Sequence, residues 1–188
     1  MSELTAYYQR AADGFAARLA LVADADWALP TPCTEWSVRD LVAHVLDEQL
    51  WIPPLVGGET IAEVGERFSG DQIGTDASGS WARAQVAVLT AFAPEGAEER
   101  TVGLSFGEAS AAEYGWQVAV DTLIHTWDLA RAIGGDEELP VDDVRRALDE
   151  LAPMVEAWRA AGVFGAVVEV GPDADDETRL LGLVGRAR

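Results

Sequence analysis

The sequence predicts an all-α protein, a four-helix bundle with an extra C-terminal helix and short extended segments. In four stretches, apolar residues recur every three or four positions, as is typical of amphipathic helices: residues 4–22, 37–51, 80–92 and 116–133. Proline pairs or clusters of glycine and polar residues separate them, and the repeating strand-helix pattern of an α/β protein is missing. A chain of 188 residues has the length of one domain, so we expect residues 1–188 to form a single bundle domain.

The first helix is predicted over Leu4–Val22, where apolar side chains follow one face. The connection after it, residues 24–36, has Pro30 and Pro32 two positions apart. Proline lacks an N–H donor and its ring clashes with the preceding helical turn. We therefore expect irregular backbone between the first two helices.

The second helix is predicted to begin after Ser37, whose hydroxyl can cap the first turn. Asp40, at the third helical position, supplies the reciprocal acid of a capping box. The helix should run to about Trp51 and stop at Pro53 and Pro54, because two adjacent prolines remove two helical hydrogen bonds.

Residues 57–79 are rich in glycine, aspartate, serine and threonine and lack sustained periodicity. We expect a long loop here with one helical turn near residues 61–68, and loops of this length are often functional lids. A third helix is predicted over Ser80–Phe92, and weak alternation over Arg100–Phe106 indicates a short extended stretch.

The fourth helix, Trp116–Ile133, is the organising element of the chain. No proline interrupts it, and Gly134 is suited to the left-handed conformation that ends many helices. After it, we predict a helix over Val141–Ala161 with a kink at Pro153, then an apolar extended arm. The last helical turn is expected at residues 179–184.

The amino-acid composition limits the classes of partner that the protein can bind. Thirteen arginines, no lysine and thirty-three acidic residues give a net charge of −20, so nucleic acid and anionic membranes are unfavourable partners. The N-terminus lacks the pattern of a signal peptide, and no stretch of eighteen apolar residues is present. We expect a cytoplasmic protein, and a homodimeric assembly is left open.

Asp121 and His125 are four positions apart in the fourth helix, so they lie one turn apart on the same face. The only other histidine, His44, lies in the second helix among apolar neighbours. A lone histidine there would most often be a core residue bonded to a carbonyl or carboxylate. Two histidines and an acid from two helices instead match the three-ligand set of a catalytic zinc or related site with one open position.

The stretches Trp36–His44 and Asp121–Ala130, with the preceding Pro30–Cys33, resemble the actinobacterial branch of the DinB-like superfamily. That branch includes the N-terminal domain of mycothiol-dependent maleylpyruvate isomerase and short metal-binding proteins of unassigned activity. The resemblance covers nearly the whole chain. It implies a four-helix bundle that holds a divalent ion through one histidine of the second helix and an acid-x-x-x-His pair of a later helix.

Carried over residue by residue, this resemblance implies His44, Asp121 and His125 as ligands of a divalent ion, most often zinc, with nickel, iron or manganese as alternatives. It also implies mycothiol or another thiol as cofactor, whose sulfur a metal can ionise. The isomerase has glutamate where this chain has Asp121. It also has a second, C-terminal domain that we do not expect here, so maleylpyruvate isomerase activity itself is not transferred.

Several residues can line this site. Glu48, one turn beyond His44, could be a fourth ligand or general base, although a solvated or supporting role is favoured. Asp128 could orient His125 through its other ring nitrogen or pair with Arg131. Two tryptophans are expected near the site, Trp36 and Trp127.

Two other features of the sequence, a G-x-S-x-G motif and a single cysteine, suggest functions that are less favoured. Gly103–Gly107 matches the G-x-S-x-G elbow of serine hydrolases, but that elbow needs a buried strand before it and a helix directly after it, and the chain lacks the repeating strand-helix pattern of such proteins. Cys33 has no basic neighbour that would lower its pKa, so a packing role is favoured over a redox role. Two functions remain. The first is a metal- and thiol-dependent transferase or isomerase acting on a small electrophile, and the second is a non-catalytic metal-binding bundle with a structural or sensing role.

Overall fold

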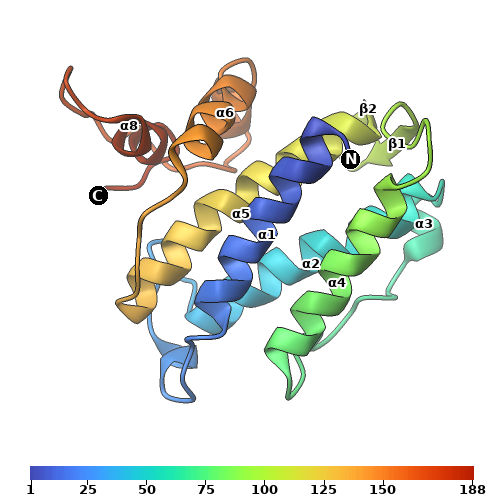
Figure 1. Ribbon diagram of the computed structural model, residues 1–188, viewed down its shortest axis with the longest axis horizontal. Coiled ribbons are helices and arrows are strands. Elements are labelled where there is room, and N and C mark those ends of the chain that lie inside the picture. The colour runs from blue at the N-terminus through green and yellow to red at the C-terminus, as the bar shows by residue number, and fades with distance from the viewer. The chain divides into compact units, whose positions relative to one another are not determined.

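The computed structural model describes residues 1–188 and is mostly helical, which confirms the all-α prediction (Figure 1). The chain divides into two compact units, Met1–Asp136 (unit 1) and Glu137–Arg188 (unit 2). The assignment of residues 1–188 to a single domain stays a prediction. No helix is long and apolar enough to cross a membrane.

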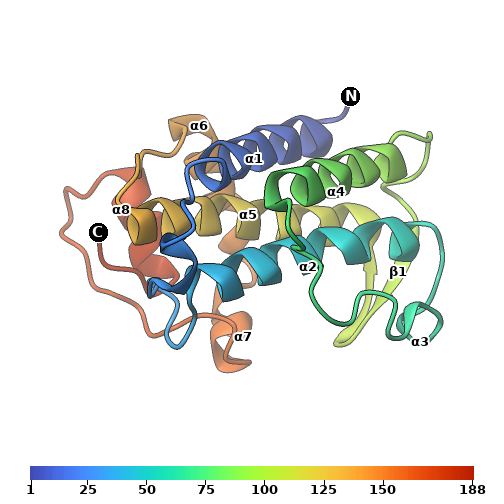
Figure 2. The ribbon, with the colours of Figure 1, turned by 90° about the horizontal axis from the view of Figure 1, so that it is seen from below.

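Unit 1 is built on four long helices: α1 (Glu3–Leu19), α2 (Val38–Val56), α4 (Ala77–Phe92) and α5 (Ala111–Ile133). Helix α1 packs against α5 and α4, and α2 packs against α4 and α5, so the four helices close into a bundle (Figures 1 and 2). Aromatic and aliphatic side chains from all four helices fill its interior, among them Phe15, Leu41, Trp81, Leu123 and Trp127.

Helix α5 is buried along most of its length and passes through the centre of this packing. It begins at Ala111, five residues before the predicted start, because Ser110 and Glu113 form a capping box that the periodicity did not reveal. Its end agrees with the prediction. Gly134 has φ 66° and ψ 30°, the left-handed conformation expected after a helix.

Helix α2 begins as predicted, at the Ser37–Asp40 capping box, but the predicted stop at Pro53 and Pro54 is wrong. The helix continues through both prolines to Val56. The fixed φ of proline is compatible with a helix, and the prolines weaken only its last turn. Burial of Leu55 and Val56 offsets that loss.

The predicted loop 57–79 contains α3 (Ile61–Val64), a single turn capped by Thr60, and its last three residues belong to the next helix. The rest is built of turns, bends and irregular backbone. Helix α4 begins at Ala77 rather than Ser80, because the Asp76 side chain accepts a hydrogen bond from the Gly79 N–H and caps it.

The extended stretch predicted at residues 100–106 is strand β1 (Thr101–Leu104). It pairs antiparallel with β2 (Gly107–Ser110), a partner that we did not predict. Ser105 lies in the exposed turn of this hairpin. The G-x-S-x-G stretch is therefore no nucleophile elbow.

Unit 2 contains α6 (Val141–Leu151), α7 (Val155–Ala160) and α8 (Asp176–Leu183). The predicted helix Val141–Ala161 is broken rather than kinked, because Pro153 interrupts its hydrogen bonding. The apolar arm after α7 lies against α8, where the Val168 N–H donates to the Gly182 carbonyl. Gly182 is required there, since a Cβ atom would lie 2.6 Å from the Val168 oxygen.

Candidate metal centre

Helices α2 and α5 bring the three predicted ligands together. The His44 Nε2 atom of α2 lies 3.4 Å from Asp121 Oδ2 of α5, and the His125 Nε2 atom lies 3.4 Å from Asp121 Oδ1. One donor atom from each of the three residues lies within 4.8 Å of the others. His125 is buried, whereas the side chains of His44 and Asp121 are 32% and 28% exposed. The group therefore lies at the edge of the bundle core, within reach of solvent.

These donors suit a divalent ion. Two imidazole nitrogens and a carboxylate oxygen are the ligand types of zinc, and three protein ligands leave a position for a further molecule. Asp121 Oδ2 is buried and makes no hydrogen bond of good geometry, and its charged neighbour is His44 Nε2 at 3.4 Å. A cation between these atoms would compensate the carboxylate.

The charges of the group are strongly coupled. Burial by itself would raise the pKa of Asp121, but the imidazoles of His125 and His44 outweigh it and hold that pKa far below its usual value. For His125, burial would lower the pKa. The carboxylates of Asp121 and Asp128 and the Cys33 side chain oppose burial and raise the pKa of His125 well above its usual value. Without a metal, the cluster therefore favours an imidazolium beside a carboxylate.

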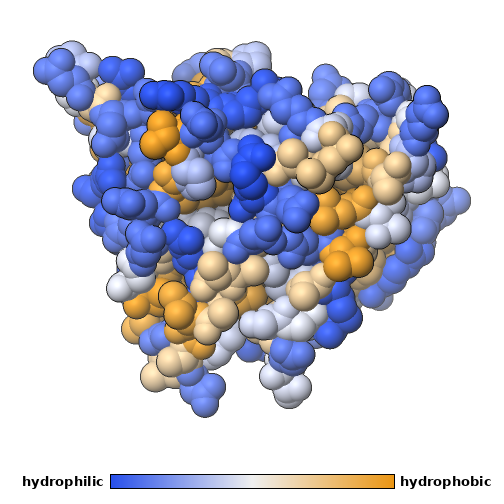
Figure 3. Space-filling view, in the orientation of Figure 1, coloured by the Kyte–Doolittle hydropathy of each residue, from blue (hydrophilic) through white to orange (hydrophobic).

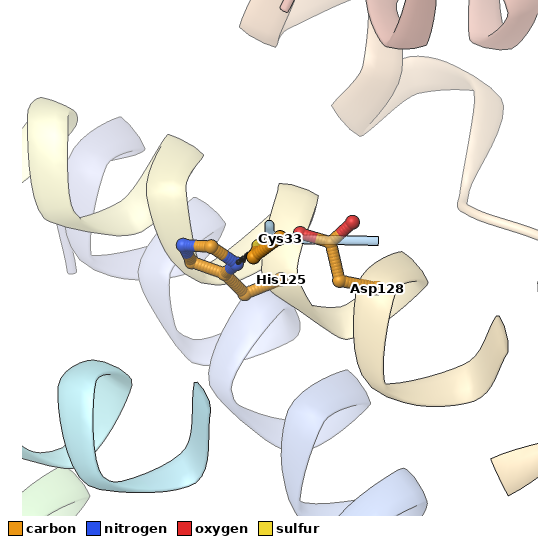
Figure 4. A group of neighbouring side chains, drawn as sticks. All are labelled: Cys33, His125 and Asp128. Carbon is orange, nitrogen blue, oxygen red and sulfur yellow. Dashed lines mark hydrogen bonds and ion pairs between the residues drawn. The ribbon is translucent and has the colours of Figure 1, made fainter. Parts of the chain in front are cut away.

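The other ring nitrogen of His125 faces Asp128, one turn further along α5 (Figure 4). The distance from Nδ1 to Asp128 Oδ2 is 2.8 Å, and Asp128 is fully buried. When Nδ1–H donates to this carboxylate, the lone pair of Nε2 points toward Asp121 and His44. Of the two roles weighed for Asp128, the geometry therefore agrees with orienting the imidazole of His125.

Cys33 reaches the same place from the α1–α2 connection. Its thiol donates to Asp128 Oδ2 at 3.3 Å, and its Sγ lies 3.8 Å from His125 Nδ1 (Figure 4). A Cys-His-Asp catalytic relay requires the sulfur and the carboxylate on opposite ring nitrogens. Here both lie at Nδ1, so this group is not such a relay.

Trp36 covers both imidazoles. Its ring centroid lies 4.7 Å from that of His44 and 5.8 Å from that of His125. The backbone before it is tightly turned, since Glu35 has φ 69° and Thr31 Oγ1 donates to the Trp36 carbonyl. Trp127, the other predicted aromatic neighbour, is buried with the Arg131 guanidinium 4.6 Å from its ring centroid.

Glu48 lies on α2, one turn beyond His44, and is half-buried. Burial raises the pKa of Glu48 to about 7, and the negative charge of Asp121 adds to this effect. A carboxyl group with this pKa can both hold and release a proton near neutral pH.

Cys33 is the residue whose position the sequence did not indicate. We favoured a packing role because no basic residue is its neighbour in sequence, but the imidazole that it approaches lies 92 positions away. Two signals could have pointed to it: Cys33 lies in the Pro30–Cys33 stretch that carries the family resemblance, and it comes shortly before Trp36 and the second helix, which carries His44.

The fold and the site define a helical bundle whose second and last long helices present a two-histidine, one-carboxylate cluster. Residues 8–130 match the family described as the mycothiol maleylpyruvate isomerase N-terminal domain. The chain belongs to this family.

The chain is also similar to two sequence relatives and to one solved structure. The chain is 36% identical over 150 residues to uncharacterized proteins of two Mycobacterium tuberculosis strains, CDC 1551 and H37Rv, covering 77% of this chain and 74% of each relative. A crystal structure of a histidine-to-alanine mutant of mycothiol-dependent maleylpyruvate isomerase matches with a TM-score of 0.65 and 17% identity, over 92% of this chain and 77% of that one. At this identity the match establishes the fold. Because unit 1 ends at Asp136, the match over 92% of 188 residues includes part of unit 2.

Proposed function

We propose that the protein binds one divalent ion, zinc in the first place, through His44, Asp121 and His125, and uses it in a thiol-dependent transfer or isomerisation of a small electrophile. The observation that carries this proposal is the convergence of two imidazole nitrogens on a carboxylate whose buried oxygen has no hydrogen-bond partner. Mycothiol is the first thiol to test, because the family and the similar solved structure are named for their dependence on it.

Each residue has a definite part. Asp121 supplies the single negative charge, and the two imidazoles bind through Nε2. Asp128 holds the Nδ1 proton of His125 and fixes the ring. A bound divalent ion lowers the pKa of a coordinated thiol, so that the thiolate is present near neutral pH.

We assign to Glu48 the acceptance of the proton of an incoming thiol. Its carboxyl group lies in the electrostatic field of Asp121, His44 and His125, and its pKa is about 7. Trp36, whose ring lies tilted against both imidazoles, covers one side of the site.

Metal analysis and spectroscopy test this function. The purified protein should carry about one equivalent of divalent metal per chain, and both His44→Ala and His125→Ala should lose it. Asp142→Asn, an exposed acid in unit 2, serves as the control that keeps the metal. Full metal content in both histidine variants would contradict the ligand assignment.

A second measurement separates an enzyme from a structural metal bundle. A structural zinc is fully coordinated by protein, and its removal unfolds the domain. We expect the chelated protein to stay folded, because the core of unit 1 is built from four packed helices. The visible spectrum of the cobalt-substituted protein should change when mycothiol is added. Unfolding on chelation, with a cobalt spectrum indifferent to every thiol tried, would leave the non-catalytic metal-binding role.

A further inference from the structure

A second set of metal-ligand side chains surrounds the other nitrogen of His125 (Figure 4). The Nδ1 atom of His125, the Sγ atom of Cys33 and a carboxylate oxygen of Asp128 lie within 4.8 Å of one another. The three separations are 2.8, 3.3 and 3.8 Å. Ligand atoms about 2.0–2.3 Å from a tetrahedral zinc lie roughly 3.3–3.8 Å apart. The two separations that involve Sγ fit this range, and the Nδ1–Oδ2 pair, now at hydrogen-bond distance, would open by about 0.5 Å to hold an ion.

We propose that Cys33, His125 and Asp128 form a second metal site, selective for a soft divalent ion such as Cd²⁺. A thiolate and a carboxylate together neutralise the charge of such an ion, which matters because Asp128 is fully buried. Thiolate is also the ligand that soft ions prefer over the imidazole and carboxylate of the first site. This assignment does not depend on the thiol-dependent reaction proposed above.

The two sites exclude each other, because a neutral imidazole offers a single lone pair. With the proton on Nδ1, His125 donates to Asp128 and its Nε2 can bind a metal beside Asp121. With the proton on Nε2, the Nε2–H group points to Asp121 Oδ1, which lies 3.4 Å from Nε2. The lone pair is then on Nδ1, and Nδ1 can bind a metal beside Cys33 and Asp128. The tautomer of His125 therefore selects the site.

Few bonds change when a metal ion occupies the second site. The thiol of Cys33 releases its proton to solvent, and the sulfur–hydrogen bond is replaced by a sulfur–metal bond. When the ion enters the metal-free protein, the imidazolium of His125 also releases its Nδ1 proton to solvent and keeps the proton on Nε2. When the ion displaces a metal from the first site, the Nδ1 proton of the neutral ring is replaced by a proton on Nε2. Cys33 is only half-buried and lies in the α1–α2 connection, so an ion can reach its sulfur from solvent.

Cadmium added to the cobalt-loaded protein tests the proposal. We expect a near-ultraviolet thiolate-to-cadmium absorption together with release of one equivalent of cobalt. Cys33→Ser should abolish the absorption, and His44→Ala should keep it, since His44 belongs to the first site alone. Far-ultraviolet circular dichroism of both variants checks that they are folded.

Three outcomes would overturn the proposal. Cobalt release without the thiolate absorption would mean that cadmium enters the first site. The thiolate absorption with cobalt retained would mean that both ions bind together and that the sites are not exclusive. A folded His44→Ala variant that gives no thiolate absorption would remove the second site, whereas loss of cobalt binding alone in that variant would concern only the first site.

Discussion

Acidic side chains in unit 2 and in helix α5 of unit 1 have different surroundings. In unit 2, Asp176 pairs with Arg145 at 2.8 Å and Asp175 pairs with Arg188 at 3.0 Å, in ion pairs whose side chains are partly or largely exposed. In α5, the partly exposed Asp121 and the fully buried Asp128 face the imidazole ring of His125 at the edge of the bundle core. Exposed ion pairs contribute little to stability, whereas a buried carboxylate must be compensated. The net charge of −20 therefore gives little information about function. The two α5 carboxylates that face His125 are more informative, because they define the candidate metal centre.

Among the acidic and basic residues of these two regions, replacing Asp128 should have the largest effect on stability and metal affinity. Asp128→Ala leaves the buried Nδ1–H of His125 and the Cys33 thiol without their shared acceptor, which should cost about 1–3 kcal/mol of unfolding free energy. Loss of a carboxylate behind a metal-binding histidine also lowers metal affinity by about 10- to 100-fold. Denaturant unfolding and metal titration measure the two effects.

Asp128→Asn is the matched control for that variant, because its amide oxygen can still accept from Nδ1–H. It should recover most of the metal affinity lost in Asp128→Ala. Equal affinities in Asp128→Ala and the unmodified protein would show that the carboxylate does not position His125, even if stability falls.

The pH dependence of stability should separate the metal-free from the metal-loaded protein. The pKa of His125 is raised, so its contribution is complete below its unfolded value of about 6.5 and is lost as pH rises through the folded pKa. The pKa of Asp121 is lowered, so its contribution is present above about 3.8 and is lost only in strong acid. Glu48 acts in the same direction as His125, because burial of its charge destabilises the fold as pH rises from 4.5 to about 7. The metal-free protein should therefore be most stable in mildly acidic buffer.

Metal binding should reverse this trend, because the ion competes with protons for the imidazoles and gains affinity as pH rises. Melting temperatures measured from pH 5 to 9, with and without zinc, should diverge with increasing pH. His125→Gln should flatten the metal-free curve and Glu48→Gln should remove part of its slope. Parallel curves for the two forms would contradict the coupled cluster at the α2–α5 contact.

The parts of the structure that the sequence predicted are those set by neighbours along the chain. The Ser37–Asp40 capping box, the end of α5 at Gly134 and the one-turn spacing of Asp121 and His125 are all local. The starts of α4 and α5 were also local, set by Asp76 and by the Ser110–Glu113 capping box, but the apolar periodicity did not reveal them. Two other errors have a different origin. Helix α2 continues through its two prolines because of tertiary burial, and strand β2 exists only as the partner of β1.

The position of Cys33 illustrates the same limit. Its contact with His125 joins segments 92 residues apart, and no periodicity encodes such a distance. The resemblance to a known bundle family pointed to His44, Asp121 and His125 together, and although it included Cys33, it gave this thiol no role at the opposite ring nitrogen. That contact follows only from the way the α1–α2 connection folds back against α5.

Replacing an arginine of unit 2 should give the smallest effect. Arg145 bonds Asp176 at 2.8 Å and also approaches Asp142 at 3.7 Å, but its side chain is 61% exposed. Solvent screens both pairs, and holding two side chains in one geometry costs entropy. Arg145→Ala should therefore leave the melting temperature nearly unchanged and should not alter metal content or the pH profile. If it destabilised the protein as much as Asp128→Ala, surface pairing in unit 2 would matter as much as the buried carboxylates of α5, and the contrast between the two regions would fail.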